Sequence, residues 1–170
     1  MIAFLLGVAW LAAQLEPVEA AVTARARASD GDSLHLGEDR VRLLGIDAPE
    51  LAQLCTDASG REWPCGRKAR DAMLALLRRG ELTCLPDGRD RYDRMLAHCR
   101  IGKEDIAAVM VRDGWAVATE DYFAEEQAAR RARKGIWQGG FELPRDWRRD
   151  EGAQRRDDGP LDGLMRFLRG

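Results

Sequence analysis

The stretch Arg42-Leu43-Leu44-Gly45-Ile46-Asp47-Ala48-Pro49-Glu50 is the most informative part of this sequence. Its aliphatic residues predict a buried strand, with an arginine at one end and two carboxylates just past the other. Pro49 disfavours a helical backbone at the residue before it, so Asp47 to Glu50 is predicted to be a turn. Two acidic groups on a rigid turn beside a guanidinium suit a hard cation and an anionic substrate. The stretch therefore suggests phosphodiester chemistry.

Short strands joined by tight turns surround this stretch. The predicted strands are residues 22–28, 34–36, 40–46, 81–85 and 95–101. Helices are predicted at residues 66–79, 105–114 and 122–134, each with a glycine close to its C-terminal end. Five short strands with one helix between the third and the fourth predict an oligonucleotide-binding (OB) barrel, an α+β or mainly β fold with three helices.

The two ends of the 170-residue chain differ from its middle. Residues 1–20 contain an apolar run too short to span a bilayer and are predicted to be a signal peptide. No lysine or arginine precedes that run, so a retained leader is the alternative. Residues 21–147 are predicted to form the domain, and residues 148–170 a flexible charged tail. We expect no membrane span after removal of the leader, and a periplasmic or secreted protein.

The overall charge does not point to a nucleic-acid partner. Without residues 1–20 the chain has 27 basic and 27 acidic residues. Residues 61–103, however, contain eleven Lys or Arg against six Asp or Glu. This excess is compatible with an anion-binding surface or, equally well, with solvated helix faces.

Four cysteines in a chain with a predicted leader favour two disulfides. Three pairings are possible, and we favour Cys55–Cys65, which closes a short loop, and Cys84–Cys99, which joins neighbouring strands of a hairpin. A zinc site is disfavoured because no Cys-x-x-Cys spacing occurs. The tryptophans are predicted to pack in the core rather than to stack on bases: Trp63, Trp115, Trp137 and Trp147.

Several short motifs together resemble the thermonuclease, or staphylococcal nuclease-like, family. The motifs are Asp30-Gly31-Asp32-Ser33, Arg42 to Glu50, Asp90-Arg91-Tyr92-Asp93-Arg94, and Gly114 followed by a helix ending at Gly135-Ile136-Trp137. They occur in the family's order over about residues 22–138. The resemblance implies a calcium-dependent nuclease that hydrolyses DNA or RNA with little sequence specificity and leaves 3′-phosphate ends.

The resemblance also implies roles for individual residues. Glu50 falls on the position of the general base, and Arg42 and Arg94 fall on those of the two arginines that hold the scissile phosphate. The implied calcium ligands are Asp32, Asp47, Glu50 and the backbone carbonyl of Ala48. The implied contacts to neighbouring nucleotides are Arg91, Tyr92 and Tyr122.

Two residues depart from the family pattern. Glu120 stands where a partner of the stacking tyrosine is expected, and Asp93 replaces a glycine, although aspartate tolerates a positive φ better than most residues. These departures and the neutral net charge favour a rival interpretation, an OB-fold module that binds nucleic acid or protein without cutting. A purely structural envelope protein is a third. A monomer is expected, and nothing implies a stable protein partner.

Overall fold

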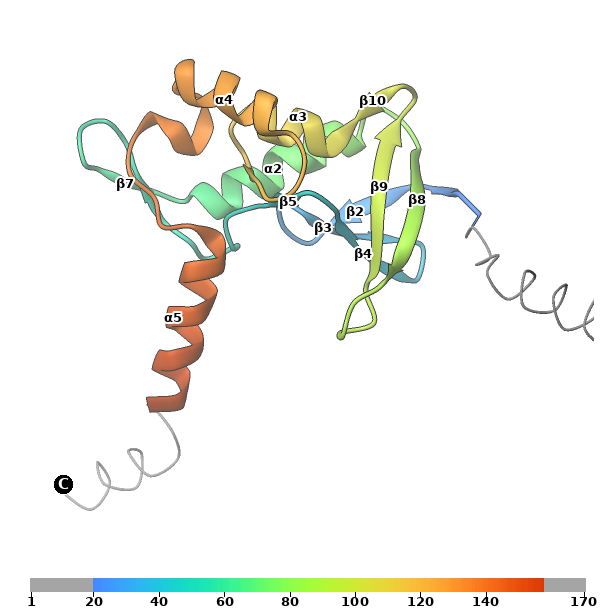
Figure 1. Cartoon of the computed structure of the whole chain (residues 1–170), viewed down its shortest axis with the longest axis horizontal. Coiled ribbons are helices and arrows are strands. Elements are labelled where there is room, and N and C mark those ends of the chain that lie inside the picture. Colours follow the sequence, from blue (N-terminus) through green and yellow to red (C-terminus); the bar gives the residue numbers. More distant parts are fainter. Residues whose placement is uncertain (1–19, 158–170) are drawn as a thin grey trace, which may run out of the picture.

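The computed structural model of the chain describes residues 20–157 (Figure 1). The predicted signal peptide, apart from Ala20, and the end of the predicted tail beyond Asp157 lie outside the described residues. No helix within residues 20–157 combines the length and the apolar character that crossing a membrane requires.

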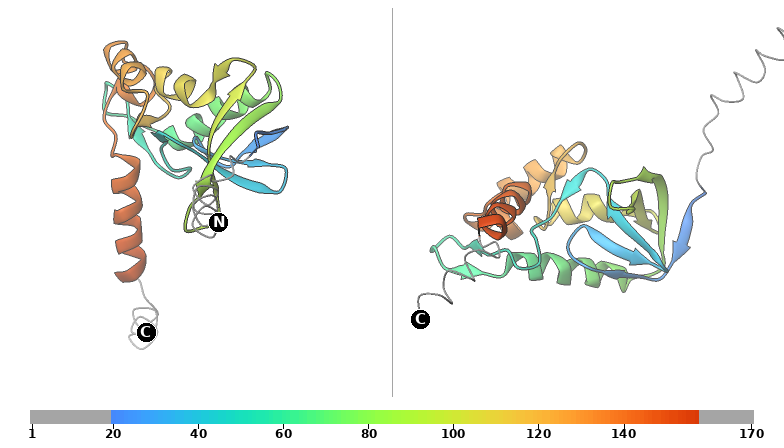
Figure 2. Two further views of the ribbon diagram at one scale, coloured as in Figure 1. Left: turned by 45° about the vertical axis from the view of Figure 1, so that its right-hand side comes forward. Right: turned by 90° about the horizontal axis from the view of Figure 1, so that it is seen from below.

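Five stretches of extended chain close into a barrel (Figure 2). Their order is β1–β8–β9–β4–β3–β2, and β1 and β2 are one stretch interrupted only at Arg25. Because β1 pairs with β8 and β2 pairs with β3, this stretch joins the two edges of the sheet. The predicted five-stranded OB barrel is therefore confirmed. The bounds are β1 (Val22–Ala24), β2 (Ala26–Ala28), β3 (Ser33–Leu36), β4 (Asp39–Leu43), β8 (Leu82–Arg89) and β9 (Met95–Ile101).

Short strands extend or flank the barrel. They are β5 (Ile46–Asp47) paired with β11 (Val117–Ala118), β6 (Cys55–Thr56) paired with β7 (Glu62–Trp63), and β10 (Glu104–Asp105) on β9. The predicted strand 40–46 is interrupted, because the chain turns at Gly45 with a φ of 76°. A Cβ there would lie 2.9 Å from the Tyr122 ring, so the turn needs glycine for space as well as for φ. The turn redirects Asp47 away from the barrel ladder.

Three helices correspond to the predicted ones. They are α2 (Cys65–Leu77), α3 (Ile106–Arg112) and α4 (Phe123–Arg131), followed by the 3₁₀ turn η1 (Gly135–Gln138). Asp105 caps the start of α3, since its carboxylate accepts from the N–H groups of Ala107 and Ala108 at 2.9 and 3.1 Å. The buried side chains of α2, such as Met73, pack with barrel residues such as Leu34 and Leu43 in one core.

A fourth helix, α5 (Pro144–Asp157), replaces the first part of the predicted flexible tail. Proline at its first position has the φ that a helix requires and no N–H to leave unpaired. The helix projects from the body of the molecule (Figure 1). It lacks a continuous apolar face, so hydrophobic periodicity predicted a tail from residue 148 onward instead of a helix.

Both predicted disulfides are present. Cys84 lies opposite Cys99 in the β8–β9 ladder, and their Cα atoms are 4.1 Å apart. The Cα atoms of Cys55 and Cys65 are 5.6 Å apart. This second disulfide lies in a small separate core with Val117 and Ile136, against which Trp63, Trp137, Phe141 and Leu143 pack. That core fixes the chain just before α5.

Candidate active site

A cavity of about 840 Å³ lies where the barrel, the tip of the β8–β9 hairpin and α5 meet. Five of the residues with predicted site roles line it: Arg42, Glu50, Arg91, Tyr92 and Arg94. The rest of its lining consists of Asp30, Ser33, Arg40, Arg145, Trp147, Arg148 and Arg149. Segments distant in sequence thus converge on one strongly basic pocket.

The barrel wall of this cavity holds an arginine between two carboxylates. Arg42 lies opposite Ser33 in the β3–β4 ladder, next to Asp32 in the turn before β3. Its guanidinium donates one hydrogen bond to Asp32 and a second, of 2.7 Å, to Asp47 Oδ1. Burial acts to lower the pKa of Arg42, but the two carboxylates raise it above its usual value. Arg42 therefore stays charged.

Asp32 is the most deeply buried acid of the site, with 2% of its surface exposed. The N–H of Ala48 donates to its Oδ2 at 2.6 Å, and the Ser33 hydroxyl donates to its Oδ1 at 3.1 Å. Burial raises the pKa of the Asp32 carboxyl to about 8, although the positive charge of Arg42 opposes the shift. A buried acid surrounded by donors is a position where further positive charge is stabilising.

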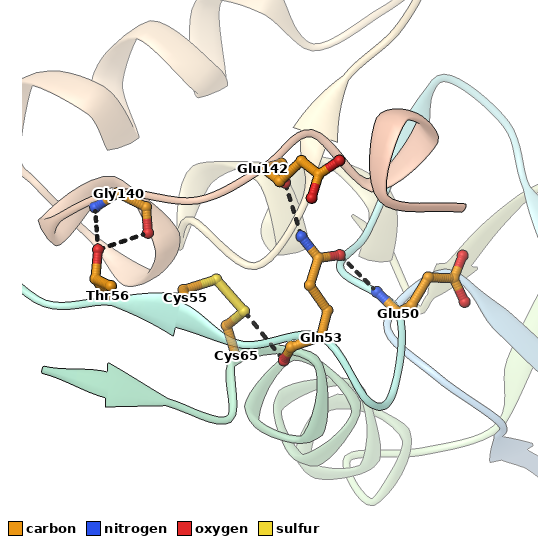
Figure 3. The surroundings of a disulfide bond; sticks show 7 residues. All are labelled: Glu50, Gln53, Cys55, Thr56, Cys65, Gly140 and Glu142. Carbon is orange, nitrogen blue, oxygen red and sulfur yellow. Dashed lines mark hydrogen bonds between the residues drawn. A yellow bond between two sulfur atoms is a disulfide. The ribbon is translucent and has the colours of Figure 1, made fainter. Parts of the chain in front are cut away.

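Glu50 lies on a turn that is fixed through its backbone. Its N–H donates to Gln53 Oε1 at 3.1 Å (Figure 3). Its carbonyl accepts from the Gln53 N–H at 2.7 Å. The start of α2 packs directly on this turn, because a Cβ on Gly66 would lie 1.7 Å from the Glu50 carbonyl oxygen. The Glu50 side chain takes no part in these backbone contacts and lines the cavity.

Gln53 also connects the Glu50 turn to the chain that leads into α5. The side chain is completely buried, and its Nε2 donates to the Glu142 carbonyl at 2.7 Å. Beside it, the Thr56 hydroxyl donates to the Gly140 carbonyl at 3.2 Å and accepts from the Gly140 N–H at 3.1 Å (Figure 3). The Cys55–Cys65 disulfide closes the loop. No sequence pattern indicates this role, since residues 51–64 lack periodicity.

The tip of the β8–β9 hairpin carries the second arginine. Asp90 Oδ2 accepts from Arg94 Nε at 2.8 Å, and Asp90 Oδ1 accepts from the N–H groups of Tyr92 and Arg94. Burial opposes the effect, but these hydrogen bonds lower the pKa of Asp90 to about 2. Asp93 has a φ of 59°, so the residue that replaces glycine does adopt a positive φ.

The α5 wall contributes an arginine that the sequence analysis missed. Arg148 donates to both oxygens of Asp47 at 3.0 Å and to Glu50 Oε1 at 2.8 Å. Burial acts to lower its pKa, whereas the bonds to Asp47 and Glu50 raise it above the usual value. The only sequence signal was a cluster of arginines after Pro144, and Trp147, which was predicted to be core, lines the cavity beside it.

The predicted calcium ligands lie close together but face arginines. Three carboxylates and a backbone carbonyl are the oxygen donors that calcium prefers, so the donor chemistry fits that ion. Among the described residues, no group of three His, Cys, Asp or Glu side chains is arranged to hold a metal ion. Both oxygens of Asp47 are bonded to Arg148, and Oδ1 is shared with Arg42.

Tyr122 does not join the other predicted site residues. Its hydroxyl donates to Asp105 Oδ2 at 2.8 Å, and its ring packs against the barrel core. Burial, together with the bond to Asp105, raises the pKa of this phenol above its usual value. Tyr122 is therefore bonded to Asp105 and is not among the described residues that line the cavity.

A closed OB barrel with a cavity of arginines beside buried carboxylates is the architecture of a protein that handles phosphate esters. Residues 40–139 match the family described as "Staphylococcal nuclease homologue". The chain therefore belongs to the staphylococcal nuclease family.

Of three relatives, two carry nuclease names and one is named for succinoglycan biosynthesis. "Succinoglycan biosynthesis protein ExoI" of Rhizobium meliloti (strain 1021) is 32% identical over 123 residues, which are 68% of this chain and 64% of that protein. "Probable staphylococcal-like nuclease CAN3" of Oryza sativa subsp. japonica is 31% identical over 125 residues, 69% of this chain and 30% of the relative. "Probable endonuclease LCL3" of Schizophyllum commune (strain H4-8 / FGSC 9210) is 32% identical over 133 residues, 64% and 44%. The chain thus spans less than two thirds of the length of these relatives.

Proposed function

We propose that this protein is a calcium-dependent nuclease that hydrolyses phosphodiester bonds of DNA or RNA with little sequence specificity. The observation that carries the proposal is the convergence of Glu50, Arg42 and Arg94 on one cavity. Membership of the staphylococcal nuclease family and the names of two relatives, a staphylococcal-like nuclease and an endonuclease, support the same reaction class.

Arg42 and Arg94 are proposed to hold the scissile phosphate. Each is held by carboxylates, Arg42 by Asp32 and Asp47 and Arg94 by Asp90, so neither needs to be ordered when substrate binds. Guanidinium groups donate in pairs to phosphate oxygens, and charge grows on those oxygens in the transition state. A lysine would present a single point charge and would not substitute fully.

Glu50 is the proposed general base. Its backbone is held by Gln53 while its carboxylate reaches the cavity, the arrangement that a base needs to deprotonate a positioned water molecule. General-base catalysis contributes about 10² to 10⁴ in rate.

The proposed calcium ligands are Asp32, Asp47, Glu50 and the carbonyl of Ala48. Bound there, calcium would supply a positive charge against the charge that develops on the phosphate. Arg91 and Tyr92 would contact a neighbouring phosphate, since both line the cavity next to Arg94. Contacts to phosphates do not distinguish one base from another, which is consistent with low sequence specificity.

Export to the periplasm or the medium is part of the proposal. Two disulfides support it, because they form and persist in oxidising compartments. The apolar leader of residues 1–20 points the same way.

The test is cleavage of single-stranded DNA and RNA by the oxidised protein, with calcium or with a chelator. We expect calcium-dependent cutting that leaves 3′-phosphate ends. Glu50→Gln and Arg94→Ala should each reduce the rate by at least about a hundredfold, on the magnitudes for general bases and charge-stabilising donors. Arg100→Ala, an exposed arginine on β9, is the matched control. Undiminished cutting by either variant would overturn the assigned roles.

A binding module without catalysis is the second candidate. It is favoured by Arg148, which engages both Asp47 and Glu50, the groups that catalysis would use. Retention of single strands by the oxidised protein, without cleavage at any calcium concentration, would select this candidate. Cleavage lost on chelation excludes it.

A further inference from the structure

Helix α5 lies outside the residues that match the nuclease family, which end at residue 139, yet it reaches into the site. Its Arg148 makes three hydrogen bonds of 2.8 to 3.0 Å to Asp47 and Glu50. These are two of the carboxylates assigned to calcium in the proposed function, and the inference that follows rests on that function.

The guanidinium of Arg148 takes up the oxygens that a cation would need. One of its nitrogens bridges Asp47 Oδ1 and Glu50 Oε1, and the other bonds to Asp47 Oδ2. A carboxylate oxygen that accepts from a guanidinium at this distance cannot also coordinate calcium at about 2.3 to 2.6 Å without moving away from the arginine. Arg148 and the ion therefore compete for the same oxygens.

The competition is reversible because Arg148 differs from Arg42. The side chain of Arg148 is 40% exposed, whereas that of Arg42 is 18% exposed and lies between two buried acids. A partly exposed arginine returns to water at a lower cost than one that is buried between acids. The chain before α5 is held by the Gln53 bond to Glu142, so a displaced Arg148 stays nearby at a high effective concentration.

We propose that Arg148 sets the cation affinity of this site by occupying Asp47 and Glu50 until a divalent ion displaces it. Arg42 donates to Asp32 and to Asp47 Oδ1, so the oxygens that Arg148 alone occupies are Asp47 Oδ2 and Glu50 Oε1. These two oxygens are the ones that a displaced Arg148 would free for the ion. The result is a site whose carboxylates are neutralised and positioned without metal, and which fills only above a calcium concentration determined by the arginine.

The test measures calcium binding by titration calorimetry on the oxidised protein, with no substrate present. Removal of the competing fork in Arg148→Gln should tighten calcium binding about tenfold or more, as expected for loss of charge-assisted hydrogen bonds. Arg148→Lys keeps the charge but cannot bridge three oxygens in a fork, so its affinity should lie between those of the parent and Arg148→Gln.

Arg149→Gln is the matched control. Arg149 lies on the same helix, lines the same cavity and carries the same charge, but its ion pairs are with Asp146 and Asp150, at 3.4 and 3.7 Å. Its replacement should change calcium affinity by less than about twofold, the size expected for an exposed, screened charge. Equal tightening in Arg149→Gln and Arg148→Gln would show a general field effect and overturn the proposal.

Thermal unfolding provides a second readout that a purely structural role would not reproduce. In chelator, Arg148→Gln should melt below the parent because two carboxylates lose their partner. In saturating calcium the gap should close or reverse, since a ligand stabilises the form that binds it more tightly. An equal loss of melting temperature in both conditions contradicts the proposal.

The outcomes for this inference and for the proposed function can be told apart. If the parent protein cuts nucleic acid with calcium and the calcium affinity of Arg148→Gln is unchanged, this inference alone is wrong. If neither the parent nor Arg148→Gln binds calcium, the proposed function is wrong as well.

Discussion

The two walls of the cavity are built differently. On the barrel wall, Asp32 and Asp47 are buried, and Arg42 between them is held by the strand ladder and by two carboxylates. On the α5 wall, Arg148 is 40% exposed and belongs to a helix that projects from the body of the molecule (Figure 1). Both walls present an arginine to Asp47, yet only the barrel wall is part of the core.

The barrel wall therefore suits groups whose arrangement must stay fixed, and the α5 wall suits a group that must move. Groups within a close-packed barrel cannot shift without disturbing the core, so they suit chemistry that needs a fixed arrangement. A helix attached through a few polar contacts opens at a much lower free energy than the core unfolds. Single substitutions can alter the barrel wall, the connection between the walls and the hairpin tip, and the expected effects decrease in that order.

Arg42→Ala should have the largest effect. It leaves two buried carboxylates without their cation, and removal of one partner of a buried pair costs about 3–5 kcal/mol. Urea unfolding should report a loss of this order, and nuclease activity should vanish. Arg27→Ala, an exposed arginine on β2, should leave the midpoint almost unchanged. A loss below about 1 kcal/mol would mean that water replaces Arg42 and that the wall is less rigid than described.

Gln53→Leu should have an intermediate effect. It keeps the volume but leaves the Glu142 carbonyl and the Glu50 N–H without their partner. Because both bonds are only part-buried, we expect a total cost of about 1–3 kcal/mol. Because Gln53 connects both walls, we expect loss of stability together with slower cleavage. Gln127→Leu on the exposed face of α4 is the control. Hydrogen exchange should increase in both the Glu50 turn and the start of α5, and an increase in only one would contradict the link.

Asp90→Asn should have the smallest effect on stability and a selective effect on substrate binding. The Asp90 pKa of about 2 lies below that of an unfolded aspartate, so its stabilising contribution is present above about pH 4 and is lost as the pH falls toward 2. In the variant this acid-dependent loss should disappear, while KM for DNA rises because Arg94 loses its carboxylate partner. NMR titration of the hairpin-tip amides checks the first point, and steady-state kinetics the second. If the hairpin-tip amides of Asp90→Asn still titrate at low pH, the titration belongs to a group other than Asp90.

Sequence patterns predicted the barrel, and the family resemblance supplied the residues proposed for its wall. The strand pattern and the Arg42 to Glu50 string were sufficient because alternating burial and turn residues act locally. The Leu44–Gly45 break was missed, since it depends on contact with the Tyr122 ring, far along the chain. Gln53 and Arg148 were missed for the same reason, because their partners are 89 and about a hundred residues away and neither follows a period. Tyr122 was assigned to substrate by resemblance, whereas its hydroxyl is bonded to Asp105.

The parallel pairing of β4 with β9 has a consequence for chain length. Val41 lies opposite Met95 and Arg42 opposite Leu96, so Arg94, the residue just before β9, is two positions before the partner of Arg42. An extra residue in the exposed hairpin tip, between positions 90 and 93, would extend the tip and leave this alignment unchanged. An extra residue inside β9 would turn its inward side chains outward and separate Cys99 from Cys84. Engineered insertions can therefore vary the reach of the tip along a bound strand, but not the spacing of the two arginines.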